Sequence, residues 1–143
     1  MSLLDKLKKL KKGDKEYKCI CLGLDGSGKT TFLKHAKELK FSNTTPTKKF
    51  EISKIYYEDV QLNAWDLGGE KTIRPFWQHY YASLDIVLWF IDCSDKSRFQ
   101  ESLQSLTKVL EDPKIPMLPL LIVCNKQDLA NAMPASDVSF TIS

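Results

Sequence analysis

Residues 23–30 read Gly-Leu-Asp-Gly-Ser-Gly-Lys-Thr and follow a largely apolar run over residues 17–22. This matches the phosphate-binding pattern G-x-x-x-x-G-K-[ST] in its working context, between a buried strand and a helix. Glycines let the backbone curl with its N–H groups toward anionic oxygens, and the following helix adds the positive end of its dipole. The flanking strand and helix disfavour the alternative, a chance match in a glycine turn. The sequence predicts a nucleoside triphosphate or diphosphate site, with Lys29 on the outer phosphates and Thr30 on magnesium.

Length and charge narrow the class of protein further. A chain of 143 residues with 43% hydrophobic residues suggests one domain with a real core. Residues 1–18 contain seven lysines and three acidic residues, a net charge of +4, whereas the remaining 14 basic and 15 acidic residues give −1. The body of the protein therefore lacks the basic face that nucleic-acid binding needs, and we expect no nucleic-acid partner.

The cysteines and the apolar runs indicate the compartment. Four cysteines lie in or beside apolar runs without C-x-x-C spacing, as expected for reduced, buried thiols in a cytosolic protein. The longest apolar stretch, Ile86–Ile91, is too short to span a bilayer, and lysines interrupt the N-terminal leucines where a secretory signal would be apolar. We therefore expect a cytoplasmic protein.

The N-terminus predicts an amphipathic helix over residues 1–13. Leucines at positions 3, 4, 7 and 10 share one helical face, and most of the lysines lie elsewhere. Such a helix can lie on an anionic membrane surface or dock in a groove of its own domain, and the pattern leaves both open. Residues 16–143 then form the nucleotide-binding domain.

The rest of the chain alternates between strand and helix patterns. A helix follows the phosphate loop to about Leu39, and its inward side contains Phe32, Leu33 and Ala36. Further strands are expected at Phe50–Tyr57, Val60–Asp66, Asp85–Asp92 and Leu118–Cys124. The second and third of these five strands form an antiparallel hairpin. An amphipathic helix with Phe99, Leu103, Leu106 and Leu110 inward precedes the last strand. The pattern predicts an α/β fold, a mixed and mostly parallel sheet flanked by helices, with ligands at the carboxyl ends of its strands.

Two polar segments follow predicted strands. In Asp66-Leu-Gly-Gly69, Asp66 can hold magnesium through water, and the Gly69 N–H can meet a γ-phosphate oxygen. In Asn125-Lys-Gln-Asp128, the Asp128 carboxylate can accept from the two donors of guanine, a pair that adenine lacks. There Lys126 can cover the base, and Asn125 can tie this loop to the phosphate loop. The alternative for each segment is an ordinary polar turn.

Thr47, in a polar loop just past Pro46, is a further candidate magnesium ligand. Its N–H can also contact the γ-phosphate. Threonines are common in loops, so the sequence alone favours neither a magnesium ligand nor an ordinary loop residue at position 47.

Together these segments resemble the ADP-ribosylation factor family of small GTPases. The leucine- and lysine-rich start and Ala135-Ser-Asp137 resemble its Arf-like branch in particular. The motifs that carry the resemblance are Gly23-Leu-Asp-Gly-Ser-Gly-Lys-Thr-Thr31, Thr45-Pro-Thr47, Trp65-Asp-Leu-Gly-Gly69, Ile73-Arg-Pro-Phe-Trp77, His79-Tyr-Tyr81 and Asn125-Lys-Gln-Asp-Leu129. The resemblance implies the P-loop NTPase fold and a GTP/GDP switch in membrane, vesicle or ciliary trafficking. The implied nucleotide contacts are Asp25, Gly26, Ser27, Gly28, Lys29, Thr30, Thr31, Thr47, Gly69, Asn125, Lys126 and Asp128, with magnesium on Thr30 and Thr47.

The resemblance also implies partners. GTP binding in the family reshapes the loops around Thr47 and Gly69 and expels the N-terminal helix toward membranes or partner proteins. Effectors read a hydrophobic trio, matched here by Phe50, Trp65 and Tyr80. An exchange factor and an activating protein are implied, and residues 2–12 are the implied peripheral membrane contact.

Three departures from the family pattern affect the expected activity. The implied catalytic residues are Lys29, Gly69 and Glu70. Glu70 replaces the glutamine that orients the attacking water, so we expect slow hydrolysis. Lys48-Lys49 replaces a residue–glycine pair and puts the switching amplitude in question. The chain stops at Ser143, so we expect a fold lacking the last strand and helix, an exposed apolar edge, marginal stability and a weaker guanine grip.

Two other functions compete with the switch. A truncated, non-catalytic interaction protein would keep effector or membrane contacts but bind nucleotide weakly. A small-molecule kinase would share the phosphate loop, but it needs an arginine-rich lid, and this chain has only Arg74 and Arg98. The kinase also leaves residues 125–128 without a purpose.

Overall fold

A computed structural model of the chain describes residues 16–38, 50–57 and 59–136. The predicted N-terminal helix, Thr47, Lys48 and Lys49 lie outside the described residues, as does the side chain of Phe50. None of the described helices is long and apolar enough to cross a membrane.

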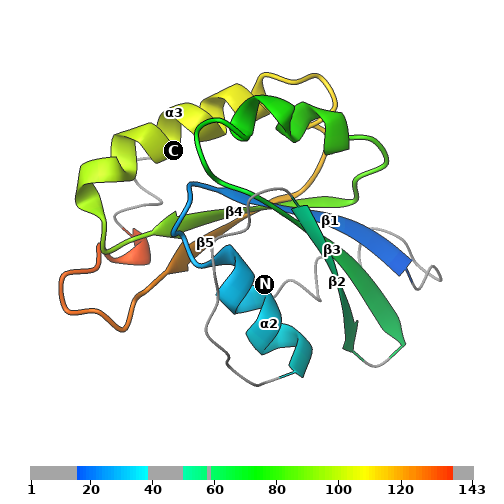
Figure 1. Ribbon diagram of the computed structural model, residues 1–143, viewed down its shortest axis with the longest axis horizontal. Helices are drawn as coiled ribbons and strands as arrows, with labels where there is room; N and C mark the ends of the chain where they lie inside the picture. Colours follow the sequence, from blue (N-terminus) through cyan, green and yellow to red (C-terminus); the bar gives the residue numbers. More distant parts are fainter. Residues whose placement is uncertain (1–15, 39–49, 58, 137–143) are drawn as a thin grey trace.

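The described strands form one five-stranded sheet (Figure 1). Its strands are β1 (Glu16–Gly23), β2 (Phe50–Tyr57), β3 (Val60–Leu67), β4 (Ile86–Asp92) and β5 (Leu120–Asn125). They lie in the order β2-β3-β1-β4-β5, and only the β2–β3 pair is antiparallel. The predicted mixed, mostly parallel sheet and the predicted hairpin are thus confirmed, with Phe50 paired to Leu67 and Tyr57 to Val60.

Helices cover both faces of the sheet, so its central strands are apolar on both sides. Helix α2 (Lys29–Glu38) lies on one face, whereas α3 (Phe99–Leu110) and the 3₁₀ helix η1 (Arg74–Tyr80) lie on the other (Figure 1). Along β1, Cys19 and Cys21 pack with Leu33 of α2, and the alternate residues Ile20 and Leu22 join the opposite cluster. Two hydrophobic clusters therefore sandwich the sheet and fix the ends of its strands.

The inward face of α3 differs from the predicted one. Its buried residues are Phe99, Ser102, Leu106 and Val109, whereas Leu103 packs at the edge of the core. Leu110 is 38% exposed, so its predicted inward position was wrong. The face is rotated because Ser102 accepts a hydrogen bond from Trp89 Nε1 at 3.2 Å, which satisfies a buried indole that a leucine would leave unpaired.

The predicted inward face of α2 also needs a correction. Leu33 is buried, but Phe32 is 38% exposed, although its ring meets the Phe90 ring edge-on at 5.2 Å. The side chain of Ala36 lies outside the described residues. Phe32 therefore sits at the rim of the core, against the carboxyl end of β4.

Strand β5 forms an edge of the described sheet. It pairs with β4 alone, and each of its six residues is partly exposed. The strand begins at Leu120 rather than Leu118, because the Leu118 N–H donates to the Ile115 carbonyl at 2.9 Å in the preceding turn and Pro119 has no N–H to donate. The predicted apolar edge is therefore present within the described residues.

Candidate nucleotide-binding site

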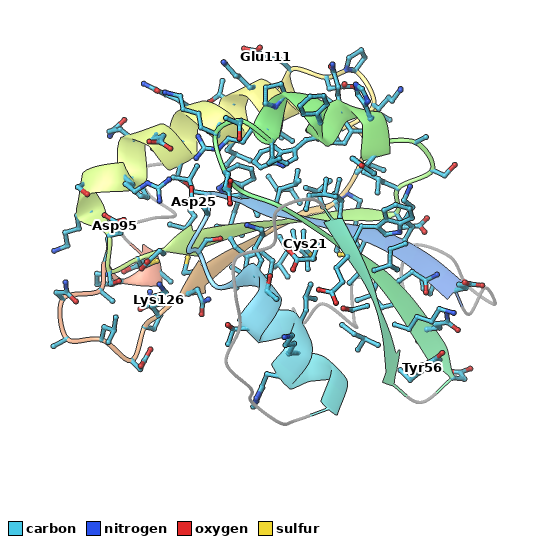
Figure 2. All side chains as sticks on the ribbon, viewed as in Figure 1. Cys21, Asp25, Tyr56, Asp95, Glu111 and Lys126 are labelled. Carbon is cyan, nitrogen blue, oxygen red and sulfur yellow. The ribbon has the colours of Figure 1, made fainter. Side chains whose placement is uncertain are left out.

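The loops at the carboxyl ends of β1, β3, β4 and β5 come together at one end of the sheet. Asp25 and Lys126 mark this end in Figure 2, whereas Tyr56 lies at the opposite end of the molecule. Parallel strands bring their carboxyl ends to the same edge, so segments separated by about 100 residues become neighbours. The site is built from these loops.

The phosphate loop is wrapped around the ammonium of Lys29. Lys29 Nζ donates to the carbonyls of Gly23 at 3.2 Å and Leu24 at 3.3 Å, and its side chain is 6% exposed. Burial lowers the pKa of Lys29 from its usual value, while nearby Asp66 acts in the opposite direction. A buried cation within a ring of backbone groups is suited to phosphate oxygens, because an anion would offset its desolvation.

Asn125 joins the loop after β5 to the phosphate loop, as the sequence predicts. Its Nδ2 donates to the Ser27 carbonyl at 2.9 Å. Gly28 has φ +92°, and a Cβ atom there would collide with the Asn125 amide. A side chain at position 28 would therefore displace the Asn125 amide, and the positive φ also favours glycine there.

Lys126 makes a second link between the same two loops. Its Nζ donates to the Gly26 carbonyl at 2.9 Å and pairs with Asp92 Oδ2 at 2.8 Å. Burial acts to raise the pKa of Asp92, but hydrogen bonds from Lys126 and Ser94 outweigh it and hold that pKa below its usual value. Lys126 has φ +61°, an uncommon conformation for a non-glycine residue that marks a constrained site.

Asp92 was missed by the sequence analysis, although a signal was present. It ends an apolar parallel strand, the position at which Asp66 and Asn125 attracted attention. Asp128 lies on the exposed turn just beyond β5, next along the chain to the linked residues Asn125 and Lys126. The predicted guanine-contacting segment is therefore fastened to the predicted phosphate-contacting segment.

Thr30 and Asp66 meet at the start of α2. Thr30 Oγ1 donates to Asp66 Oδ2 at 2.5 Å, and Asp66 is 1% exposed. A hydroxyl and a carboxylate beside a phosphate loop form the hard-oxygen donor set that magnesium favours, so these residues fit the ion that the sequence predicts. Thr31 follows in the first turn of α2.

Gly69 lies directly on the phosphate loop. A Cβ atom at position 69 would collide with the Asp25 backbone nitrogen and the Gly23 carbonyl. Trp77 Nε1 donates to the Gly68 carbonyl at 2.9 Å and so anchors this segment to η1. Glu70 begins the turn that leads into η1, where its carbonyl accepts from the N–H groups of residues 73 and 74.

Two members of the predicted effector trio lie together beside β1. The Trp65 and Tyr80 rings are 5.9 Å apart, and Lys18 Nζ stands 4.5 Å from the centre of the Trp65 ring. The side chain of Phe50 lies outside the described residues, but its backbone pairs with Leu67 at the end of the same hairpin.

The fold and the joined loops define the class of small P-loop GTPases, and comparison with known proteins agrees. The sequence model of the "ADP-ribosylation factor family" matches residues 3–143. The chain belongs to this family and is an Arf-like small GTPase. Members of the family bind guanine nucleotides with Mg²⁺.

Individual relatives place the chain near the Arf-like branch. It is 43% identical to ADP-ribosylation factor-like protein 2 of Dictyostelium discoideum, covering 97% of this chain and 76% of that protein. It is 39% identical to ADP-ribosylation factor-like protein 3 of Chlamydomonas reinhardtii, covering 99% of this chain and 80% of the relative.

A solved structure supports the fold assignment. The Arl6 small GTPase of Trypanosoma brucei, determined with a bound nucleotide analogue, matches with a TM-score of 0.80 at 27% identity. The match covers 89% of this chain and 77% of that structure. The predicted small GTPase fold and the family resemblance are therefore confirmed.

Proposed function

We propose that this chain is a guanine-nucleotide switch that binds GTP and GDP with Mg²⁺ and hydrolyses GTP slowly. The observation that carries the proposal is the pair of hydrogen bonds from Asn125 to Ser27 and from Lys126 to Gly26. They hold the segment that selects the base at a fixed place relative to the segment that binds phosphates. A nucleotide is a ligand with both parts.

Different residues bind the base, the phosphates and the metal ion. The Asp128 carboxylate accepts from the guanine donors, and the phosphate loop, residues 25–31, surrounds the phosphates. Lys29 and the Gly69 N–H take the terminal phosphate. Thr30 and Thr47 would hold Mg²⁺, and Asp66 would act on the ion through water. The ion, when bound, offsets charge on the outer phosphates.

Hydrolysis depends on how the chain orients the attacking water. An ionised Glu70 can accept a hydrogen bond from that water, but unlike glutamine it has no N–H to donate to the transition state. It also adds negative charge near the γ-phosphate. We therefore propose Glu70, Gly69 and Lys29 as the catalytic residues of a slow hydrolysis, which would prolong the lifetime of the GTP-bound state.

The proposal includes the partners of a switch. In the GTP state, Phe50, Trp65 and Tyr80 contact effectors, and an exchange factor and an activating protein set the nucleotide state. Residues 1–13 act as the amphipathic helix, with residues 2–12 contacting membranes, and residues 16–143 act as the GTP-binding domain. The corresponding setting is cytoplasmic, with peripheral membrane contact during vesicle or ciliary trafficking. The alternative, a truncated, non-catalytic interaction protein that binds nucleotide weakly, is favoured by Glu70 and by the partly exposed apolar edge at β5.

The test is the binding of fluorescent GDP and GTP with and without Mg²⁺. We expect binding that Mg²⁺ strengthens, and in Asp128→Asn a loss of about tenfold or more in affinity, because an amide cannot accept from both guanine donors. Asp128→Asn should also gain affinity for xanthine nucleotides, whose ring offers an acceptor to the amide N–H.

Asp112→Asn is the matched control, because Asp112 lies just beyond α3, away from the joined loops. Its guanine affinity should equal that of the unsubstituted chain. A folded protein that binds neither guanine nucleotide would contradict the switch and leave the interaction protein as the better account.

A further inference from the structure

Four charged residues form a cluster between the phosphate loop and α3, called here the arginine cluster. They are Asp25, Arg74, Arg98 and Glu101. They come from the phosphate loop, from η1, from the 3₁₀ turn η2 (Lys96–Arg98) and from the first turn of α3. The proposed contacts to the nucleotide and Mg²⁺ use none of these four side chains. The cluster is therefore available for a further function.

Arg74 is the centre of the arginine cluster. Its side chain is 12% exposed, its Nε donates to the Gly69 carbonyl at 2.8 Å, and its terminal nitrogen pairs with Glu101 Oε2 at 2.8 Å. The same nitrogen lies 3.5 Å from Asp25 Oδ1. A guanidinium presents its donors in a rigid plane, so one side chain fixes several acceptors relative to one another.

Arg98 holds the other side of the arginine cluster. Its two terminal nitrogens donate to the Asp25 carboxylate at 2.8 Å and to the Asp25 carbonyl at 3.1 Å. It also pairs with Glu101 at 3.2 Å. The hydrogen bond from Arg98 holds the pKa of Asp25 below its usual value, so this carboxylate stays ionised and bound at neutral pH. Asp25 is thus fastened through both its backbone and its side chain.

The two backbone segments that the arginine cluster joins are the ones that touch each other. Gly69 lies against the Asp25 nitrogen so closely that a Cβ atom would not fit. Under the proposed function, the Gly69 N–H meets the γ-phosphate and Asp25 belongs to the loop around the phosphates. A small shift of Gly69 relative to Asp25 would therefore change the space for the third phosphate and leave the first two unaffected.

We propose that Arg74, held in place by Glu101 and Asp25, is a positioning residue that sets the preference of this site for a nucleoside triphosphate over a diphosphate. This inference rests on the proposed function. The arginine cluster contains two cations and two carboxylates, so its net charge is zero and it adds little attraction of its own for phosphate. It acts by geometry, through the distance between Gly69 and the phosphate loop.

The test replaces Arg74 with lysine, which keeps the positive charge and removes the planar guanidinium. In Arg74→Lys, all donors sit on one nitrogen, whereas Arg74 reaches Gly69 and the carboxylates from different nitrogens, so we expect the ratio of affinities for a non-hydrolysable GTP analogue and for GDP to fall about tenfold. GDP affinity should change less than twofold. Glu101→Gln should lower the same ratio, and the double variant should fall by less than the product of the two effects.

Lys108→Gln is the matched control, because Lys108 lines the same groove between η1 and α3. Its affinity ratio should equal that of the unsubstituted chain. If Arg74→Lys loses its thermal transition, the half-exposed Glu101→Gln carries the same test. An unchanged ratio, or equal losses for both nucleotides, would overturn the inference alone. Failure of the unsubstituted chain to bind either nucleotide would overturn the proposed function, and this inference with it.

Discussion

At the scale of single residues, the proposal of slow hydrolysis depends on Glu70. Its backbone begins the turn into η1, and that turn is fixed by hydrogen bonds from the N–H groups of residues 73 and 74. Because the backbone is fixed, substitutions at this position change the chemistry of the side chain rather than its place. Glutamine is nearly isosteric with glutamate, so it can be exchanged here with little effect on packing.

We expect Glu70→Gln to accelerate single-turnover GTP hydrolysis by about tenfold or more, within the range that a positioned polar group contributes. The amide can accept from the attacking water and donate to the transition state, and it removes a negative charge. The measurement is phosphate release from preloaded protein with Mg²⁺. Glu111→Gln, just after α3, should leave the rate unchanged. No gain in Glu70→Gln would remove Glu70 as the cause of slow hydrolysis.

At the scale of elements, α3 shows how a sequence pattern can find a helix and misplace its face. Residues 99, 103, 106 and 110 and residues 99, 102, 106 and 109 both follow helical spacing, and hydrophobicity alone favours the first set. The second is buried, because the Trp89 indole needs an acceptor within the core and Ser102 supplies one. That requirement comes from a residue on strand β4, so no pattern within the helix could reveal it.

The buried face of α3 predicts how alanine substitutions in this helix change the free energy of unfolding. Leu106 is 2% exposed, so Leu106→Ala should cost about 2–4 kcal/mol of the free energy of unfolding, from lost burial and the cavity left behind. Leu110 is 38% exposed, so Leu110→Ala should cost less than about 1 kcal/mol. Urea unfolding of the two variants is the measurement. Equal costs would mean that α3 presents the face that the sequence pattern favoured.

At the scale of the whole molecule, the sequence predicted which loops come together better than it predicted the contacts that join them. The phosphate loop, Asp66 and Asn125–Asp128 could be predicted, because each follows an apolar strand and parallel strands must end at one edge. The arginine cluster could not, because Arg74 and Arg98 lie in 3₁₀ helices rather than at strand ends, and the motif that contains Arg74 does not indicate which residues it pairs with. Their pairing depends on how η1, η2 and α3 are placed around the phosphate loop.

The arginine cluster also makes the stability of the fold depend on pH. Hydrogen bonds from Arg98 and Arg74 hold the pKa values of Asp25 and Glu101, respectively, below the ordinary values of 3.8 and 4.5. Because the folded pKa values are depressed, their stabilisation is complete above the unfolded values and is lost as pH falls through the folded ones. We therefore expect the melting temperature to fall as pH is lowered from about 6 to about 3.

The contribution of the arginine cluster can be separated from general acid unfolding. In Arg98→Gln the carboxylates lose a cation, so their pKa values should rise toward ordinary values and the fall in melting temperature with acid should become shallower. Lys108→Gln removes a cation from α3 outside the cluster and should keep the original slope. Because the carboxylates are about 40% exposed, high salt should also flatten the slope of the unsubstituted chain, and it should flatten that of Arg98→Gln less, because only the pairs with Arg74 remain there. Parallel acid slopes for all three proteins would mean that other groups control the acid response, and that the fold does not depend on the arginine cluster.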